Sequence, residues 1–269
     1  MSATPTLSRR GPGGRGLLAL GLLASLSLSA GHEVHAFKHY TQGDELVRWW
    51  RRELIFHLAE VAPEEGDLDT VQTLAHRAFD AWTVTACGLV PPVTFAGRVN
   101  VVDATSPATV KVEPDNVIVF SRSAMEWQRK GRASTWIAVT LFAPHPSTGE
   151  MIDADIIIND GGFRFSYDDT PDPGEIDFLS MLTHEVGHFF GMDHSADVDA
   201  TMYANYANND RLAGRTLGQD DIDGICALYT DVPEHVEGGT DDGCCGGGPA
   251  SLAGLGGLVL VRAMRRRRT

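Results

Sequence analysis

The stretch "HEVGHFFGMDH", His184 to His194, constrains this chain more than any other, because it holds three of the ten histidines in the sequence. The apolar pattern of "IDFLSMLTHEVGHFF" predicts a helix. His184 and His188 are four residues apart, so both imidazoles lie on one helix face, about one turn from each other. Gly191 can adopt a positive φ, end the helix and turn the chain back towards this face. The spacing therefore predicts a site that His194 also reaches.

Three neutral imidazoles are typical ligands of a catalytic zinc ion, which keeps a further position open for water. Glu185 follows the first ligand and cannot easily join the same tetrahedron, so we expect its carboxylate to face that water. Zinc lowers the pKa of its bound water to about 7, and the resulting nucleophile attacks amide carbonyls. The residues predict a hydrolase in which His184, His188 and His194 bind one Zn²⁺ and Glu185 is the general base.

Two other hypotheses about the function of this chain remain open. The chain could be a catalytically silent zinc-binding or adhesion module with the same fold; the presence of Glu185 argues against this reading, because loss of the general base is its usual mark. It could also be another HExxH hydrolase with a distant glutamate as third ligand. His194, placed after Gly191, argues against that alternative, because the helix already has a nearby third ligand.

With the pattern HExxHxxGxxH met from His184 to His194, the chain resembles the metzincin zinc peptidases. Ser195, together with the segment "TMYANYANNDRLAGRTLGQDDIDGICALY", is similar to the matrixin branch, the matrix-metalloproteinase-like peptidases. The resemblance is tight over residues 176–229 and looser over 49–158. It implies a zinc endopeptidase that acts on protein or peptide substrates. It also implies that the substrate lies antiparallel to an edge strand over residues 136–142.

The same resemblance implies roles for residues after the third histidine. Met202 is expected in the Met-turn beneath the zinc site. Tyr203 and Tyr206 are expected in that turn and in the wall of the S1′ pocket. Asp220 and Asp221, on the last helix, are expected to brace the turn.

The strand before the active helix reads "DADIIIND" and departs from the matrixin pattern. Asp155 stands where a ligand histidine of the family's structural zinc would stand, so we expect that second zinc to be missing. Asp153, Asp155 and Asp160 lie in an acidic, Gly-rich segment, and hard cations take oxygen ligands of this kind. Calcium binding and a solvated turn without a ligand are equally good interpretations of these three residues.

The remaining patterns predict one α+β domain over residues 37–231, with a mixed twisted sheet and three helices. Apolar positions spaced three and four apart predict a helix over 68–82, in addition to the helix over 176–190 and a last helix from about 218. Strand-like runs separated by Pro and Gly are expected at 54–58, near 95, and at 116–120, 135–142 and 151–158.

The sequence patterns at the two ends of the chain indicate targeting segments. Three arginines precede the apolar run of residues 17–30, which predicts a signal peptide over residues 1–36 with cleavage after Ala36. Cleavage after Ala30 and a membrane anchor are the weaker alternatives. Residues 232–248 form an acidic linker rich in Gly and Cys. Residues 249–269 form an apolar, Arg-rich tail. Together with the Cys pair before it, the segment over about 243–269 resembles the C-terminal sorting tails of myxobacterial surface proteins and would sort or anchor the chain at the cell surface. A plain membrane tail is the alternative.

The net charge limits the classes of partner that this chain can bind. Removing both ends takes eight Arg and one Glu from 22 basic and 36 acidic residues, and the remaining 14 basic and 35 acidic residues carry about −21. This charge repels nucleic acid and anionic lipid, so we expect no nucleic-acid partner and contact with the membrane only through the tail, before processing or as an anchor. We also expect a monomer. The domain over residues 37–231 contains two cysteines, Cys87 and Cys226. Export favours a disulfide between them, but the sequence does not show that they lie close together.

Overall fold

The structure is a computed structural model of the chain and describes residues 35–85, 87–101, 116–205, 212–232 and 257–258. All described residues belong to one compact unit that begins at His35. Nearly all of the expected signal peptide, linker and tail, and also Tyr206, lie outside the described residues.

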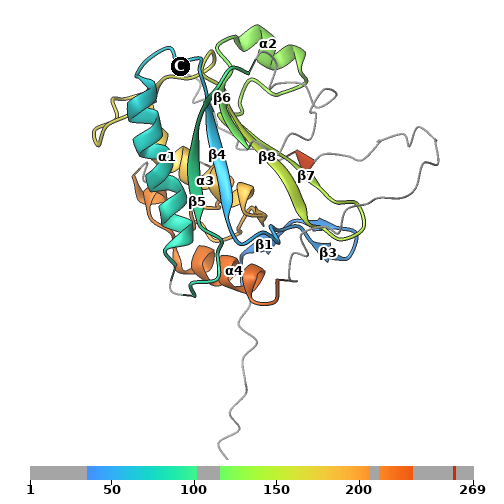
Figure 1. The fold of residues 1–269 in the computed structure, drawn as a ribbon. Coiled ribbons are helices and arrows are strands. Elements are labelled where there is room, and N and C mark those ends of the chain that lie inside the picture. The colour runs from blue at the N-terminus through green and yellow to red at the C-terminus, as the bar shows by residue number, and fades with distance from the viewer. Residues whose placement is uncertain (1–34, 86, 102–115, 206–211, 233–256, 259–269) are drawn as a thin grey trace, which may run out of the picture. The chain divides into compact units, whose positions relative to one another are not determined.

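A mixed sheet forms the centre of this unit, and its labelled strands lie side by side in Figure 1. The strand order is β12-β7-β8-β6-β4-β5. Parallel pairing joins β5 to β4, β4 to β6 and β6 to β8, whereas β7 runs antiparallel to β8. The strands are β4 (Leu54–Ala59), β5 (Val93–Val99), β6 (Val117–Phe120), β7 (Ala138–Pro144), β8 (Met151–Ile158) and β12 (Gly257–Leu258).

β7 carries a further strand on the side that faces away from β8. The short strand β12 pairs with it in antiparallel orientation, with Gly257 opposite Phe142 and Leu258 opposite Leu141. The sequence led us to expect β7 as an edge strand. The structure therefore places a two-residue strand of the C-terminal segment on that expected edge.

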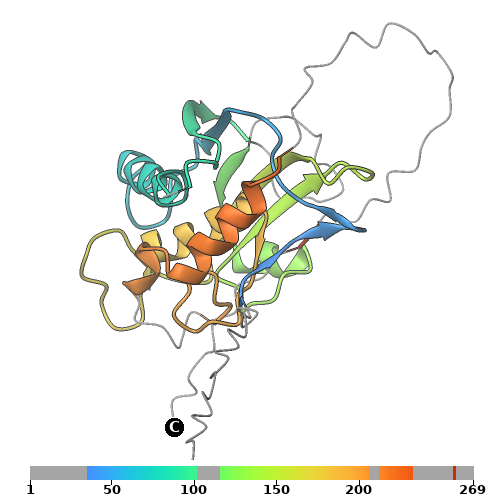
Figure 2. The ribbon, with the colours of Figure 1, turned by 90° about the horizontal axis from the view of Figure 1, so that it is seen from below.

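The three predicted helices are α1 (Leu68–Thr83), α3 (Phe178–Phe189) and α4 (Gln219–Tyr229). α1 buries the predicted apolar face and packs against α3, which in turn packs against β7 and β8. α4, drawn in orange, lies beyond one end of the strands in Figure 1 and towards the viewer in Figure 2. Over the described ranges, no helix is long and apolar enough to cross a membrane.

A fourth helix, α2 (Ala124–Arg129), adds to the three that the sequence predicted. Six residues are too few for a helical periodicity to stand out, although Ser123 caps the helix by accepting a hydrogen bond from the Glu126 N–H. Trp127 of α2 packs with Val139 and Ile157 in a separate apolar cluster. A single helical turn, η2 (Ala213–Arg215), packs against α3.

Pairs of two-residue strands tie the loops together. β1 (Lys38–His39) pairs antiparallel with β11 (Met192–Asp193), and β2 (Thr41–Gln42) pairs antiparallel with β3 (Glu45–Leu46). β9 (Phe165–Ser166) and β10 (Ile176–Asp177) are parallel. The pairing of β1 with β11 places the N-terminal segment beside the residues that lead to His194.

α3 is buried along its whole length, and Gly187 permits its closest contact. A Cβ atom at Gly187 would lie 2.2 Å from Met202 Sδ and 2.6 Å from Trp82 Cζ2. The indole N–H of Trp82 donates a hydrogen bond of 2.8 Å to the Thr183 carbonyl of α3. The absence of a side chain at Gly187 therefore lets Trp82 of α1 and Met202 approach α3 closely.

Cys87 and Cys226 form a disulfide, which resolves the question that the sequence left open. The bond joins the segment after α1 to α4 across a separation of 139 residues. It thus connects two helices that lie on either side of the active helix in the sequence.

Gly187→Ala is expected to lower the free energy of unfolding by about 1–3 kcal/mol, because the new methyl group overpacks the contact with Met202 and Trp82. Alanine favours an isolated helix by about 1 kcal/mol over glycine, so any loss of stability reports the contact and not helix propensity. Denaturant unfolding measures the change. Equal or greater stability of the variant would contradict this account of α3 packing.

Replacing both cysteines, Cys87→Ser with Cys226→Ser, is expected to lower the free energy of unfolding by about 2–5 kcal/mol, since the disulfide restricts a long loop of the unfolded chain. Reduction of the wild-type chain should reproduce this change. If the oxidised wild type and the double variant unfold at the same denaturant concentration, the disulfide contributes no stability.

Candidate metal centre

The start of α3 is fixed by a buried carboxylate. Asp177 is fully buried and accepts a hydrogen bond of 2.7 Å from the Ser180 N–H, the N-cap arrangement that satisfies a free helix donor. Arg215 forms an ion pair with Asp177 and a second one with Asp169. η2, which carries Arg215, is thereby tied to the first turn of the helix that bears His184 and His188.

The predicted turn at Gly191 is confirmed. Gly191 has a φ of 101°, and a Cβ atom there would lie 2.1 Å from the Val47 carbonyl oxygen, so only glycine fits. The Tyr40 N–H donates a hydrogen bond of 3.0 Å to the Gly191 carbonyl. From this turn the chain enters β11, and His194 follows β11 directly.

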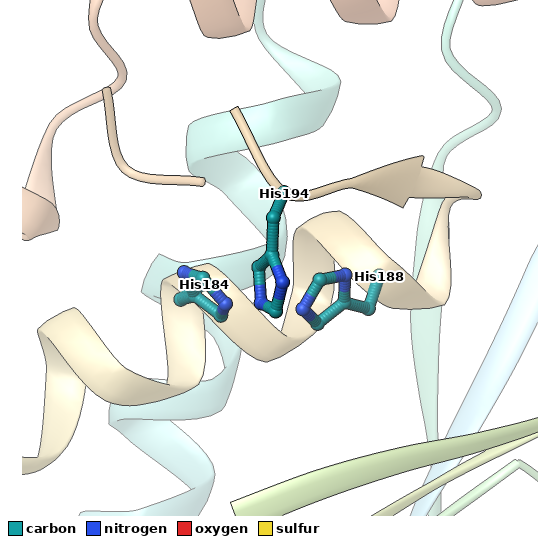
Figure 3. Close-up of side chains that lie close together, drawn as sticks. All are labelled: His184, His188 and His194. Carbon is teal, nitrogen blue, oxygen red and sulfur yellow. The ribbon is translucent and has the colours of Figure 1, made fainter. Parts of the chain in front are cut away.

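The three histidines meet as the spacing predicted. Figure 3 shows the rings of His184 and His188, from α3, and that of His194 pointing towards one another. One ligand nitrogen from each ring lies within 4.8 Å of the other two. Among the residues described by the structure, this is the only group of three His, Cys, Asp or Glu side chains with metal-binding spacing.

Hydrogen bonds fix which ring nitrogen is free. His184 Nδ1 lies 2.6 Å from the Thr201 carbonyl oxygen, and His188 Nδ1 lies 2.8 Å from that of Met192. A carbonyl only accepts, so each Nδ1 carries the proton and leaves the Nε2 lone pair unused. The Nε2 atoms of His184, His188 and His194 are buried and have no hydrogen-bond partner. Three buried imidazole nitrogens without a partner, two of them fixed in the unprotonated form, fit a zinc ion, which binds neutral imidazole.

Burial also keeps the imidazoles neutral. It lowers the pKa of His184 to about 3 and the pKa of His188 well below its ordinary value. The pKa of His194 is lowered for the same reason, with a smaller contribution from Lys38 that is opposed by Asp193. Because a protonated imidazole cannot bind a metal, these shifts favour the metal-binding form at neutral pH.

The two carboxylate oxygens of Glu185 differ in their partners. Oε2 accepts a hydrogen bond of 2.7 Å from the Thr140 hydroxyl, whereas Oε1 is buried without a partner. Burial raises the pKa of Glu185 to about 8, although the hydrogen bond from Thr140 opposes the shift. A cation at the three histidines would favour the ionised form, because opposite charges attract. Glu185 is therefore placed to exchange a proton through Oε1.

Met202 and Asp221, to which the resemblance assigns the Met-turn and its brace, are joined by hydrogen bonds beside α3. Met202 is fully buried and lies against α3 at Gly187. The carboxylate of Asp221 accepts hydrogen bonds from the backbone N–H groups of Thr201, Met202 and Gly218, at 2.6, 3.0 and 2.8 Å. Since the Thr201 carbonyl holds His184, Asp221 connects α4 to the first histidine.

Asp220 braces the segment after the third histidine. Its carboxylate accepts a hydrogen bond of 2.6 Å from the Ser195 hydroxyl and two further bonds, of 3.0 and 3.1 Å, from the N–H groups of Ala36 and Phe37. The N-terminal segment, α4 and the residue next to His194 therefore share one carboxylate. Tyr203 is partly buried beside this segment, where a backbone bridge pairs it with Ser195.

The three aspartates proposed for calcium have protein partners. Asp155 accepts a hydrogen bond of 2.8 Å from the Val117 N–H, and Asp160 accepts one of 2.7 Å from the Glu64 N–H. Asp153 lies with Asp155 on β8. Calcium binding by these residues stays a prediction.

The sequence did not indicate two groups that support the site: Thr140, which contacts Glu185, and Arg215, which contacts the N-cap residue of α3. Thr140 lies in the run "AVTLF" of a predicted strand, and β-branched residues are common in strands, so its presence there did not indicate a function. Its signal was its position as the one hydroxyl among apolar residues in this run. Arg215 gave no local signal, because its partner Asp177 is 38 residues away.

Comparison with known proteins agrees with this geometry. A sequence model of the matrixin family matches residues 48–230. Human matrilysin (Homo sapiens) is 52% identical over 54 residues, which are 20% of each chain. Rabbit interstitial collagenase (Oryctolagus cuniculus) is 27% identical over 184 residues, 68% of this chain and 33% of the collagenase. Metalloendoproteinase 5-MMP of Arabidopsis thaliana is 29% identical over 197 residues, 72% of this chain and 48% of that protein.

The chain spans between a fifth and a half of the length of these relatives. The family match itself covers most of the chain and includes α3, the Met-turn and α4. This chain therefore belongs to the matrixin family and has the α+β metzincin fold of that family.

Proposed function

We propose that the chain is a secreted or surface-attached zinc endopeptidase, in which His184, His188 and His194 hold the zinc and Glu185 is the general base. The observation that carries the proposal is the set of buried atoms without partners, namely three imidazole Nε2 atoms and Glu185 Oε1. Buried polar atoms are normally hydrogen-bonded. Four such atoms without a partner, on α3 and on the residue after β11, therefore support the binding of a metal ion and water at this site.

When bound, zinc supplies a Lewis acid that polarises the scissile carbonyl and makes water acidic. The chain's own residues hold and orient the imidazoles through the carbonyls of Thr201 and Met192. Glu185 accepts a proton from the attacking water while the water oxygen bonds to the carbonyl carbon. As the C–N bond breaks, Glu185 gives this proton to the leaving amine.

A substrate peptide would add as an antiparallel strand to β7, with main-chain hydrogen bonds providing affinity. This placement is supported by Thr140 of β7, which contacts Glu185, because the strand passes directly beside the general base. The pairing of β12 with β7 shows that an extended segment fits along this strand. Since β12 and a substrate would need the same N–H and C=O groups, their binding would be mutually exclusive.

Export is proposed from the two ends of the sequence. Residues 1–36 read as a signal peptide, and residues 249–269 as a sorting or anchoring tail after the linker at 232–248. The Cys87–Cys226 disulfide supports an oxidising destination. Mass spectrometry of the termini of the exported chain tests this part. Retention of both ends on a cytoplasmic chain would contradict it.

The activity is tested by the cleavage of denatured casein. The full chain is expected to hold one zinc ion and to lose cleavage when a chelator removes it. Glu185→Ala should keep the zinc and lower the cleavage rate by a factor of about 10²–10⁴, because general base catalysis contributes this much. His194→Ala should lose zinc affinity, whereas His145→Ala, a substitution of an exposed histidine, should not.

Three outcomes separate the readings. A wild-type chain with stoichiometric zinc and no chelator-sensitive cleavage, even when cut back to residue 243 to remove β12, would favour the silent zinc-binding module. Full zinc occupancy in His194→Ala would refute the ligand assignment. Undiminished cleavage by Glu185→Ala would refute the role of the general base.

A further inference from the structure

Thr140 is a fully buried residue in the middle of β7, and its hydroxyl contacts Glu185. The hydroxyl lies 2.7 Å from Glu185 Oε2 and 3.1 Å from the Glu185 carbonyl oxygen. It has one proton to donate, and the shorter distance belongs to the carboxylate. A hydrogen bond to a charged acceptor is also stronger than one to a carbonyl.

The strand holds this hydroxyl in place. Thr140 lies opposite Ile156 in the continuous antiparallel register of β7 and β8. Its neighbours Val139 and Leu141 belong to a separate cluster with Trp127 of α2, so Thr140 points towards α3. A β-branched side chain in a strand has few rotamers, and its hydroxyl is therefore pre-organised.

The carboxylate is consequently held at one oxygen only. Oε2 is bound to Thr140, and Oε1 is the oxygen that remains without a partner in the protein. A carboxylate with neither oxygen bound could rotate about its terminal torsion, which has a broad energy profile. Binding one oxygen limits this rotation and leaves the other to meet water.

We propose that Thr140 is a positioning residue for Glu185: its hydroxyl holds Oε2 so that Oε1 is presented to the attacking water. This inference rests on the proposed function for the role of Glu185. The competing reading is structural, in which the hydroxyl only ties β7 to the carbonyl of α3.

The test uses the full chain and the nearly isosteric variant Thr140→Val, with Thr140→Ser as the variant that keeps the hydroxyl. The substrate is a quenched fluorescent peptide copied from a bond that the wild type cleaves in casein. We expect Thr140→Val to lower kcat by about 10- to 100-fold at an almost unchanged KM and unchanged zinc content, as for a misplaced catalytic group. Thr140→Ser should recover most of the loss.

Thr183→Val is the matched control. Thr183 is also fully buried, and its hydroxyl donates a hydrogen bond of 2.7 Å to a backbone carbonyl of α3, that of Leu179. This substitution removes a hydroxyl of the same burial without touching Glu185, and kcat should change little. An equal loss of kcat in Thr183→Val and Thr140→Val would show a general effect on α3 and overturn the proposal.

A double-mutant cycle separates positioning from structure. In the Glu185→Ala background, Thr140→Val should lower the residual rate no further, because the group that it positions is gone. Additive losses would support the structural reading. A wild-type kcat in Thr140→Val, or a Thr140→Ser variant as slow as Thr140→Val, would also overturn the proposal.

A binding measurement tests the positioning role of Thr140 even if no peptide is cleaved. Acetohydroxamic acid binds zinc and carries an O–H that a nearby carboxylate can accept. The zinc-loaded Thr140→Val variant should bind it about tenfold more weakly than Thr183→Val and the wild type, because its carboxylate is no longer held. Equal affinity of all three would refute the positioning role, whereas an inactive wild type would refute only the proposed function.

Discussion

The stability of this fold depends on four buried polar atoms that have no partner in the protein. They are the Nε2 atoms of the three histidines and Oε1 of Glu185, carried by α3 and by the segment after β11. Each such atom costs roughly 1–3 kcal/mol if it stays unsatisfied. Their sum is comparable to the whole net stability of a typical domain, about 5–15 kcal/mol. A zinc ion bound at these atoms would offset this cost, and we therefore expect metal binding and folding to be coupled.

The surroundings of the histidines are built from distant parts of the sequence. Carbonyls of the Met-turn and of β11 orient two imidazoles, and Asp221 of α4 holds the backbone of the Met-turn. Gly187 and Gly191 let neighbouring segments approach at distances that no side chain would allow. The site is thus supported from several elements, which the core and a disulfide hold together.

Local patterns were enough to predict the parts of the site that obey a fixed spacing. The helix with His184 and His188, the turn at Gly191 and the third histidine follow from helical geometry and from the freedom of glycine at positive φ. Met202, Asp220 and Asp221 came from resemblance to matrixins, and the structure shows the contacts that explain their positions.

Contacts between distant segments were not predictable in the same way. Thr140 reaches Glu185 only because β7 and α3 pack together, and Arg215 reaches Asp177 only because η2 folds back on α3. The sequence left the disulfide undecided for the same reason, since Cys87 and Cys226 carry no local signal of proximity. Helix α2 and strand β12 were missed because each is too short for periodicity to reveal it.

The proposed zinc site of this chain consists of three imidazole Nε2 atoms and no other side chain. X-ray absorption at the zinc edge of the loaded full chain tests it directly, because this method reports the type and distance of the ligands. We expect three imidazole nitrogens at about 2.0–2.1 Å and one further oxygen ligand from solvent. A sulfur ligand at about 2.3 Å, or fewer than three imidazoles, would contradict it.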